Sequence, residues 1–182
     1  KVFEAYVKVG AGDGLKFGAV QGEWSEVDAA GNYGMGDAAG TIKNSGGAAN
    51  VELAATEGEG LYYVQVDLDA LTFKSIKMNW GIIGDATPGG WDNETPMNYD
   101  FATNKYTLTA NLTAAGLKYR SANTGNFIYE GQDNSAWKFN VGNSDPKVTY
   151  NAAAPNFTIA SAGSHNLELT INFDGTAVTA GE

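Results

Sequence analysis

Alternation of apolar and polar residues is the feature that most limits the folds open to this chain. In "HNLELTINF" (His165–Phe173), every second residue is apolar: Leu167, Leu169, Ile171 and Phe173. The segments "VFEAYVKV" (Val2–Val9), "YYVQVDL" (Tyr62–Leu68) and "KYTLTANL" (Lys105–Leu112) alternate in the same way. Successive side chains of a strand point to opposite faces, so this period of two predicts strands buried on one face. Helical signals are scarce, and the pattern predicts an all-β fold of the β-sandwich type.

Composition excludes several classes of function. The 182 residues are 43% hydrophobic, which is enough for a core, and 24 glycines with 4 prolines predict many tight turns. The formal net charge of -10 argues against nucleic acid or an anionic membrane surface as a partner, because both require clusters of Lys and Arg. The absence of cysteine excludes disulfides, thiol catalysis and zinc–thiolate sites. A neutral ligand is compatible with all of these observations.

The chain contains an internal repeat. Three ordered blocks match, the first and third at an offset of about 102–106 residues: Val2–Phe17 with Lys105–Tyr119, Trp24 and Asn32–Gly34 with Trp137 and Asn140–Gly142, and Ala49–Phe73 with Pro155–Val178. This order predicts tandem β-sandwich domains over residues 1–75 and 76–182. The first copy has no counterpart to Met78–Asp100, so we expect it to be N-terminally incomplete and further residues to precede Lys1.

Catalytic constellations are weak. His165 is the only histidine, so neither a Ser/His/Asp triad nor a histidine metal cluster can be built with any specificity. Two groups of carboxylates resemble solvated loops in this acidic chain, and a glycosidase pair among them stays a minor alternative: Asp85, Asp92 and Glu94, and Glu130 and Asp133. We therefore expect a protein that is not an enzyme.

Two short motifs also fail to indicate a cofactor. "DLD" (Asp67–Asp69) lacks the ligand spacing of a calcium loop. "GAGDG" (Gly10–Gly14) does not lead into a helix, as a nucleotide-binding loop would. We expect no cofactor and no metal site, although a loop calcium ion remains compatible with the sequence.

The tryptophans and cations suggest carbohydrate chemistry. A sugar ring has apolar C–H faces edged by hydroxyl groups, so its site needs an exposed flat ring, here called an aromatic platform, with hydrogen-bond donors beside it. We expect Trp80 to be buried, whereas Trp91 in "TPGGWDN" either caps the core or faces solvent. Trp137 is a core residue or a platform. Lys118 and Arg120 share one face of a strand, as solvated cations or as donors beside a platform.

Together these segments resemble a known family. "WGIIGDATPGGWD" (Trp80–Asp92), "KYTLTANL", "GLKYR" (Gly116–Arg120) and "WKFNVG" (Trp137–Gly142) follow in order, like segments of the SusE/SusF family of surface starch-binding lipoproteins of glycan-foraging Gram-negative bacteria. The resemblance covers Lys77–Glu182 and is partial over Lys1–Phe73. It implies tandem immunoglobulin-like, carbohydrate-binding-module-like sandwiches. It also implies a non-catalytic protein, lipid-anchored at the outer membrane through an upstream segment, that works beside a porin-type importer and other surface glycan-binding proteins.

The resemblance also implies site residues. Trp91 and Trp137 would be the platforms, and Lys118 and Arg120 would donate hydrogen bonds to the hydroxyls of an oligo- or polysaccharide. Trp24, Tyr33 and Lys16 occupy the matching blocks of the first copy. Two departures weaken the match: the long insert "SANTGNFIYEGQDNSA" before Trp137, and Gly18 in the position of Arg120. The glycan is not specified, and a structural or adhesive surface sandwich without a sugar site is the alternative.

Overall fold

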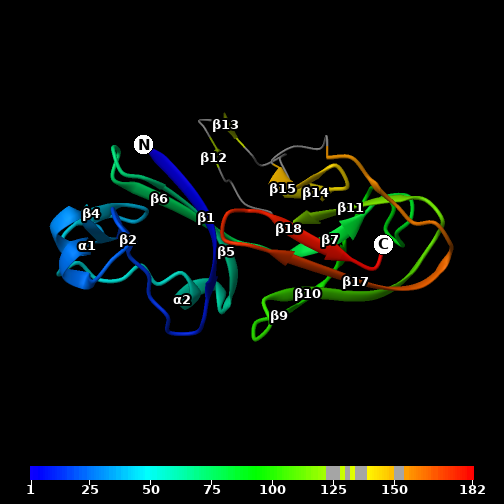
Figure 1. Ribbon diagram of the computed structural model, residues 1–182, viewed down its shortest axis with the longest axis horizontal. Helices are drawn as coiled ribbons and strands as arrows, with labels where there is room; N and C mark the ends of the chain where they lie inside the picture. The colour runs from blue at the N-terminus through cyan, green and yellow to red at the C-terminus, as the bar shows by residue number, and fades with distance from the viewer. Residues whose placement is uncertain (122–127, 130–131, 134–138, 150–153) are drawn as a thin grey trace. The chain divides into compact units, whose positions relative to one another are not determined.

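The structure is a computed structural model of the chain that describes residues 1–121, 128–129, 132–133, 139–149 and 154–182. The chain divides into two compact units, Lys1–Ser75 (unit 1) and Ile76–Glu182 (unit 2), each described separately below. Strands in antiparallel sheets dominate the described residues, which confirms the prediction of an all-β protein (Figure 1). Among these residues, no helix combines the length and the apolar composition needed to cross a membrane.

Unit 1 contains two three-stranded sheets, in the orders β1-β5-β6 and β2-β3-β4. Its strands are β1 (Val2–Val9), β2 (Phe17–Gly18), β3 (Asn32–Met35), β4 (Ile42–Asn44), β5 (Gly60–Asp67) and β6 (Thr72–Lys77), the last of which runs two residues past the division. Its helices are α1 (Trp24–Ala30) and α2 (Ala54–Glu57). The core of the unit is formed by Val9, Val51, Leu53, Ala54, Tyr62 and Val64.

Strand β5 differs from the sequence expectation. Alternation predicted burial of one face, but both Tyr62 and Tyr63 are buried. The hydroxyl of Tyr63 donates to Glu4 Oε2 at 2.7 Å, and its ring lies 5.3 Å from that of Tyr6 between centroids. Tyr63 can therefore be buried, because its hydroxyl has a hydrogen-bond partner. A hydropathy pattern does not distinguish such a buried tyrosine from an exposed one.

Helix α1 was not anticipated by the alternation pattern. At its start, the backbone N–H of Glu23 donates to Glu26 Oε2 at 3.0 Å, and the N–H of Val27 donates to the carbonyl of Glu23. The helix ends at Ala30, and the next residue, Gly31, has a φ of 136°, which favours glycine. Local capping interactions of this kind hold a short helix inside a chain of strands.

Unit 2 contains two larger sheets, in the orders β18-β17-β10-β9 and β15-β14-β11-β7-β8, with β16 also paired to β11. The first consists of β9 (Asn98–Asp100), β10 (Lys105–Leu112), β17 (Gly163–Ile171) and β18 (Ala177–Ala180). The second consists of β7 (Trp80–Ile83), β8 (Thr95–Pro96), β11 (Gly116–Ser121), β14 (Phe139–Gly142), β15 (Asp145–Thr149) and β16 (Phe157–Thr158). A short pair, β12 (Ile128–Tyr129) and β13 (Gln132–Asp133), stands apart from both.

The buried residues of unit 2 come from both sheets. The first sheet contributes Tyr106, Leu112, Leu167, Leu169 and Ile171, and the second contributes Trp80, Ile82, Leu117, Tyr119, Phe139 and Val141. The hydroxyl of Tyr106 donates to the Met78 carbonyl at 2.9 Å, and that of Tyr119 to Glu182 Oε1 at 2.8 Å. The expected burial of Trp80 is confirmed. Phe173 is 68% exposed, contrary to its parity, because β17 ends at Ile171.

The two units share strand order and register. The order β6-β5-β1 in unit 1 corresponds to β18-β17-β10 in unit 2. Val9 lies opposite Gly60, and Leu112 lies opposite Gly163, so one shift of 103 residues (112 − 9 and 163 − 60) relates both strands.

The second sheet of each unit repeats in the same way. Equivalent pairs are Phe17–Tyr33 and Tyr119–Val141, Gly18–Asn32 and Arg120–Asn140, and Leu15–Val51 and Leu117–Phe157. This shared geometry supports the predicted duplication.

Substitution of Trp80 tests how much β7 contributes to the stability of unit 2. We expect Trp80→Ala to lower the free energy of unfolding by about 3–5 kcal/mol, because it leaves a large cavity in the core. The matched control is Phe173→Ala, which removes an exposed ring and should change stability by less than about 0.5 kcal/mol. Urea unfolding followed by circular dichroism measures both, and equal effects would contradict the assigned core.

Candidate functional site

Strand β11 positions the two predicted cations on one face of a sheet. It pairs with β7 on one side and with β14 on the other, and Arg120 lies opposite Gly81 on β7. Because Gly81 has no side chain, Glu94 can lie close to this position, where it accepts the hydrogen bond of Arg120. A Cβ atom at Gly81 would lie 2.7 Å from the Thr95 carbonyl oxygen and 3.1 Å from the Cβ of Glu94, so the position leaves no room for a larger residue.

Arg120 and Glu94 form a largely covered ion pair. Arg120 Nε donates to Glu94 Oε1 at 2.5 Å, and the two side chains are only 21% and 16% exposed. Glu94 immediately precedes β8, which pairs with β7. The prediction of a solvated loop is therefore wrong for Glu94, while Asp85 and Asp92 are exposed as expected.

The loop that follows β7 carries Trp91. It is held by hydrogen bonds from Gly84 N–H to the Gly90 carbonyl at 2.9 Å and from Ala86 N–H to the Gly116 carbonyl at 3.0 Å. Thr87, which is buried, donates through Oγ1 to the Gly84 carbonyl. Gly90 adopts a φ of 57°, a turn conformation in which other residues are strained. Trp91 is thus carried by a turn that several hydrogen bonds hold in place.

Trp91 and Lys118 are in contact. Lys118 Nζ lies over the Trp91 ring, 5.4 Å from its centroid, which is cation–π geometry. Trp91 is 42% exposed, whereas Lys118 is only 6% exposed. Burial, and secondarily the positive charge of Arg120, lowers the pKa of Lys118 below its ordinary value. One face of the indole is therefore covered by the cation, while much of the side chain stays open to solvent.

The structure brings together three of the four residues predicted for the main site: Trp91, Lys118 and Arg120. Trp137 lies outside the described residues. Sequence reasoning missed the role of Glu94, because its approach to Arg120 depends on the pairing of β8 with β7 and leaves no spacing signal in the sequence. The contact with Trp91 also changes the interpretation of Lys118, which supports the ring from one side and is itself nearly covered.

The three residues suggested for unit 1 do not form an equivalent group. Trp24 begins α1 and is 67% exposed, Tyr33 lies on β3, and Lys16 Nζ donates to the Gly46 carbonyl at 2.8 Å. All three are described, and no hydrogen bond or ring contact joins them. Gly18, in the position of Arg120, offers no side-chain donor.

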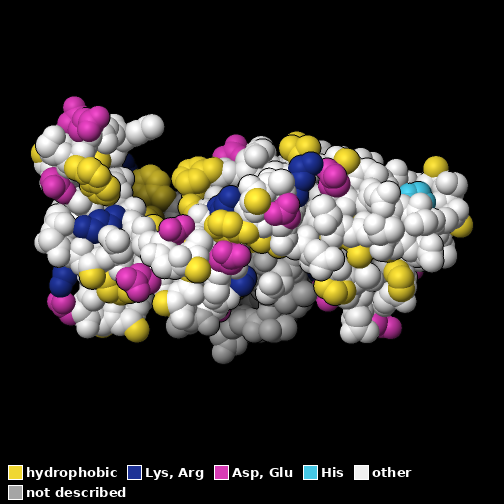
Figure 2. Space-filling view, turned by 90° about the horizontal axis from the view of Figure 1, so that it is seen from below, with side chains coloured by type: hydrophobic (Ala, Val, Ile, Leu, Met, Phe, Trp, Pro, Cys, Tyr) yellow, Lys and Arg dark blue, Asp and Glu magenta, His cyan; other side chains and the backbone are white. Residues whose placement is uncertain are grey.

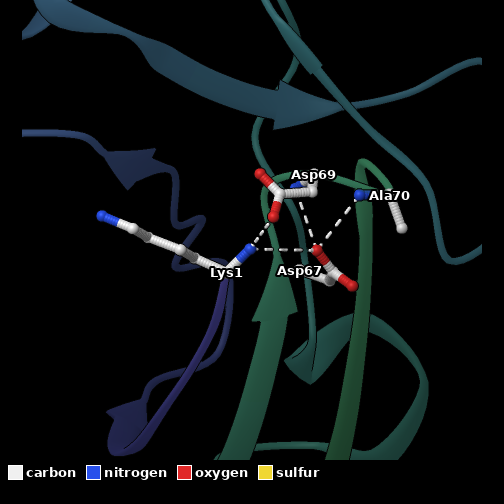
Figure 3. Close-up of polar contacts among 4 residues, drawn as sticks. All are labelled: Lys1, Asp67, Asp69 and Ala70. Carbon is white, nitrogen blue, oxygen red and sulfur yellow. Dashed lines mark hydrogen bonds and ion pairs between the residues drawn. The ribbon is translucent and has the colours of Figure 1, made fainter.

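Other titratable groups have structural roles. His165 lies on β17, and its Nε2 is 2.9 Å from the Ser161 carbonyl oxygen. In the turn after β5, Asp67 accepts hydrogen bonds from the N–H groups of Ala70 and Asp69, which hold its pKa below the ordinary value. The α-amino group of Lys1 contacts both Asp67 and Asp69 (Figure 3).

Charge is dispersed on the surface drawn in Figure 2, where acidic and basic side chains lie in small separate groups. Within the described residues, no group of three or more His, Cys, Asp or Glu side chains could hold a metal ion. The main site consists of the exposed indole of Trp91, the covered side chain of Lys118 and the covered ion pair of Arg120 with Glu94.

No protein-family model, no curated protein and no solved structure matches this chain significantly.

The ion pair gives a stability prediction. Glu94→Ala leaves the guanidinium of Arg120 largely covered without this carboxylate, so we expect a loss of about 1.5–3 kcal/mol in the free energy of unfolding. Asp92→Ala, which removes an exposed carboxylate two residues earlier, is the control and should change stability by less than about 0.5 kcal/mol. If urea unfolding gave similar losses in the free energy of unfolding for both variants, Glu94 would contribute no more to stability than an exposed carboxylate does.

Lys118 gives a pH prediction. Its lowered pKa means that the folded protein releases this proton at lower pH than the unfolded chain, so stability rises with pH between the two pKa values. We expect the fluorescence of Trp91 to titrate with a midpoint below 10.5, the ordinary value for lysine. The signal is the difference between the wild-type protein and Trp91→Phe. Lys118→Met should abolish the transition, and its persistence there would assign it to another group.

Proposed function

We propose that the protein is a non-catalytic glycan-binding protein of the cell surface, and that Trp91 is the platform of its main site. The observation that carries this proposal is the geometry of Trp91. An exposed indole held in a closely bonded turn, with a cation over one face, is a preorganised apolar surface.

The binding chemistry follows from the contacts of the site. A sugar ring would place its C–H face on the open side of Trp91. The guanidinium of Arg120 has N–H donors in addition to the Nε–H bonded to Glu94, and these would bond hydroxyl groups at the edge of the ring. Arg120 and Glu94 neutralise each other, which suits a neutral sugar better than an anionic one. Lys118 would act mainly by holding the indole in place.

The arrangement of strands is compatible with the proposed domain type. Both sheets of unit 2 contribute buried residues, as both sheets of a β-sandwich would. Unit 1 repeats part of that register, so we infer two tandem immunoglobulin-like, carbohydrate-binding-module-like sandwiches. The proposed lipid anchor at the outer membrane, the porin-type importer and the companion glycan-binding proteins rest on the sequence resemblance to the SusE/SusF family alone.

Affinity electrophoresis across a panel of neutral polysaccharides tests the function. We expect one of them to retard the wild-type chain, and Trp91→Ala to weaken binding about tenfold or more, since loss of a stacked ring costs about 1.5 kcal/mol. Phe173→Ala removes another exposed ring, away from the site, and should leave the retardation unchanged.

Three outcomes would contradict the proposal or part of it. Wild-type mobility with every glycan would favour the structural or adhesive alternative. Equal retardation of the wild-type protein and Trp91→Ala would move the site elsewhere, and Trp137→Ala then tests the second predicted platform. Release of soluble sugar that a single carboxylate substitution abolishes would show an enzyme.

A further inference from the structure

Trp91 follows two consecutive glycines, so its orientation depends on how the turn before it is held. Gly89 and Gly90 have no side chains to restrict their backbone, and Gly90 has the positive φ described above. A Cβ atom added at Gly90 would meet no heavy atom within 4 Å beyond its chain neighbours, so that side of the residue is open. The direction of the backbone at Trp91 therefore depends on hydrogen bonds made by Gly90.

Both backbone groups of Gly90 are bonded to one residue, Thr87. The N–H of Gly90 donates to the Thr87 carbonyl at 3.1 Å, and Thr87 Oγ1 donates to the Gly90 carbonyl at 3.3 Å. The same hydroxyl lies 2.9 Å from the Gly84 carbonyl oxygen. Because a hydroxyl has one proton to donate, Thr87 shares it between the carbonyl groups at the two ends of the turn. Thr87 thus joins the beginning of the turn to the residue that precedes Trp91.

The hydroxyl of Thr87 is the part of this arrangement that depends on the type of side chain. Thr87 N–H donates to the Gly84 carbonyl and Gly84 N–H donates to the Gly90 carbonyl, both at 2.9 Å, and these are backbone bonds that most residues can make. Without the hydroxyl, each carbonyl therefore keeps one backbone donor. Loss of the hydroxyl should loosen the turn without leaving a buried carbonyl unpaired.

The turn is also anchored to the strand that carries Lys118. Ala86 N–H donates to the Gly116 carbonyl at 3.0 Å, and Gly116 begins β11, two residues before Lys118. Thr87 follows Ala86 directly and is itself only 7% exposed. The hydrogen bonds of Thr87 therefore extend this anchorage to Gly90, so that the indole of Trp91 meets Lys118.

We propose that Thr87 is a positioning residue of the candidate glycan site. Its hydroxyl holds Gly90, and through it Trp91, in the orientation in which one face of the indole contacts Lys118 and the other is left for a sugar. Thr87 acts through Trp91 and does not touch the ligand. The effect on sugar binding rests on the proposed function, whereas the effect on the orientation of the indole does not.

Substitutions separate the hydroxyl of Thr87 from the shape of its side chain. Thr87→Val keeps the branched shape and lacks the hydroxyl, whereas Thr87→Ser keeps the hydroxyl. Thr109→Val is the matched control, because it removes an exposed hydroxyl that donates to Asn166 Oδ1 at 2.7 Å on the other sheet of unit 2. Urea unfolding verifies that each variant is folded.

Two kinds of measurement report on the site. The fluorescence of Trp91 is the difference between each variant and the same variant carrying Trp91→Phe. Its time-resolved anisotropy reports local motion of the ring, and its transition at alkaline pH reports the contact with Lys118. Affinity electrophoresis with a neutral polysaccharide that retards the wild-type chain reports binding.

We expect Thr87→Val to add a fast decay to the anisotropy of Trp91 and to reduce the amplitude of the Lys118 transition. It should also weaken polysaccharide binding about fivefold, the size expected for one hydrogen bond. Thr87→Ser should restore all three properties, and Thr109→Val should match the wild-type protein.

Several results would overturn the proposal. Wild-type fluorescence or wild-type polysaccharide affinity in Thr87→Val would show that the hydroxyl does not position Trp91 for binding. An equal defect in Thr87→Ser would assign the effect to side-chain shape, and an equal defect in Thr109→Val would make it unspecific. If no polysaccharide retards the wild-type chain, the proposed function fails, while the fluorescence measurements still decide whether Thr87 positions Trp91.

Discussion

The pairing of β7 with β11 is the contact on which unit 2 and its candidate site depend. On the side of the core, it places Trp80 and Ile82 beside Tyr119, all of them almost completely buried. On the other face, it places Gly81 opposite Arg120, and the missing side chain leaves room for Glu94, which binds Arg120. The loop that presents the exposed indole begins where β7 ends, so stability and the site share one short strand.

Comparison of the two units isolates what that strand contributes. The β1–β5 and β10–β17 hairpins have the same register, and the β2–β3 pair matches β11–β14. In unit 1, however, β2 is an edge strand, and Gly18 stands in the position of Arg120. Among the described residues, unit 1 has no strand paired in the place of β7, and Trp24, Tyr33 and Lys16 form no comparable group.

The charged groups of the site are engaged by other groups of the protein. A lysine that stays covered beneath an exposed indole differs from a lysine that reaches a ligand, because its charge is used within the protein to hold the ring. The charges of Arg120 and Glu94 are likewise paired with each other before any ligand binds. Such preorganisation lowers the entropy lost on binding, which matters most for weak ligands with few apolar contacts.

Period-two alternation by itself determined the all-β class, since side-chain direction in a strand is a local property. Block order along the chain placed the division near residue 75, and loop composition marked Trp91 as unusual. Only the tertiary structure decided that Lys118 lies over that ring and that Glu94 binds Arg120. Tertiary structure also decided that β5 is buried on both faces, Tyr63 included, and that Phe173 is exposed. These outcomes depend on which strands become neighbours, and strand neighbours are set by contacts between residues far apart in the sequence.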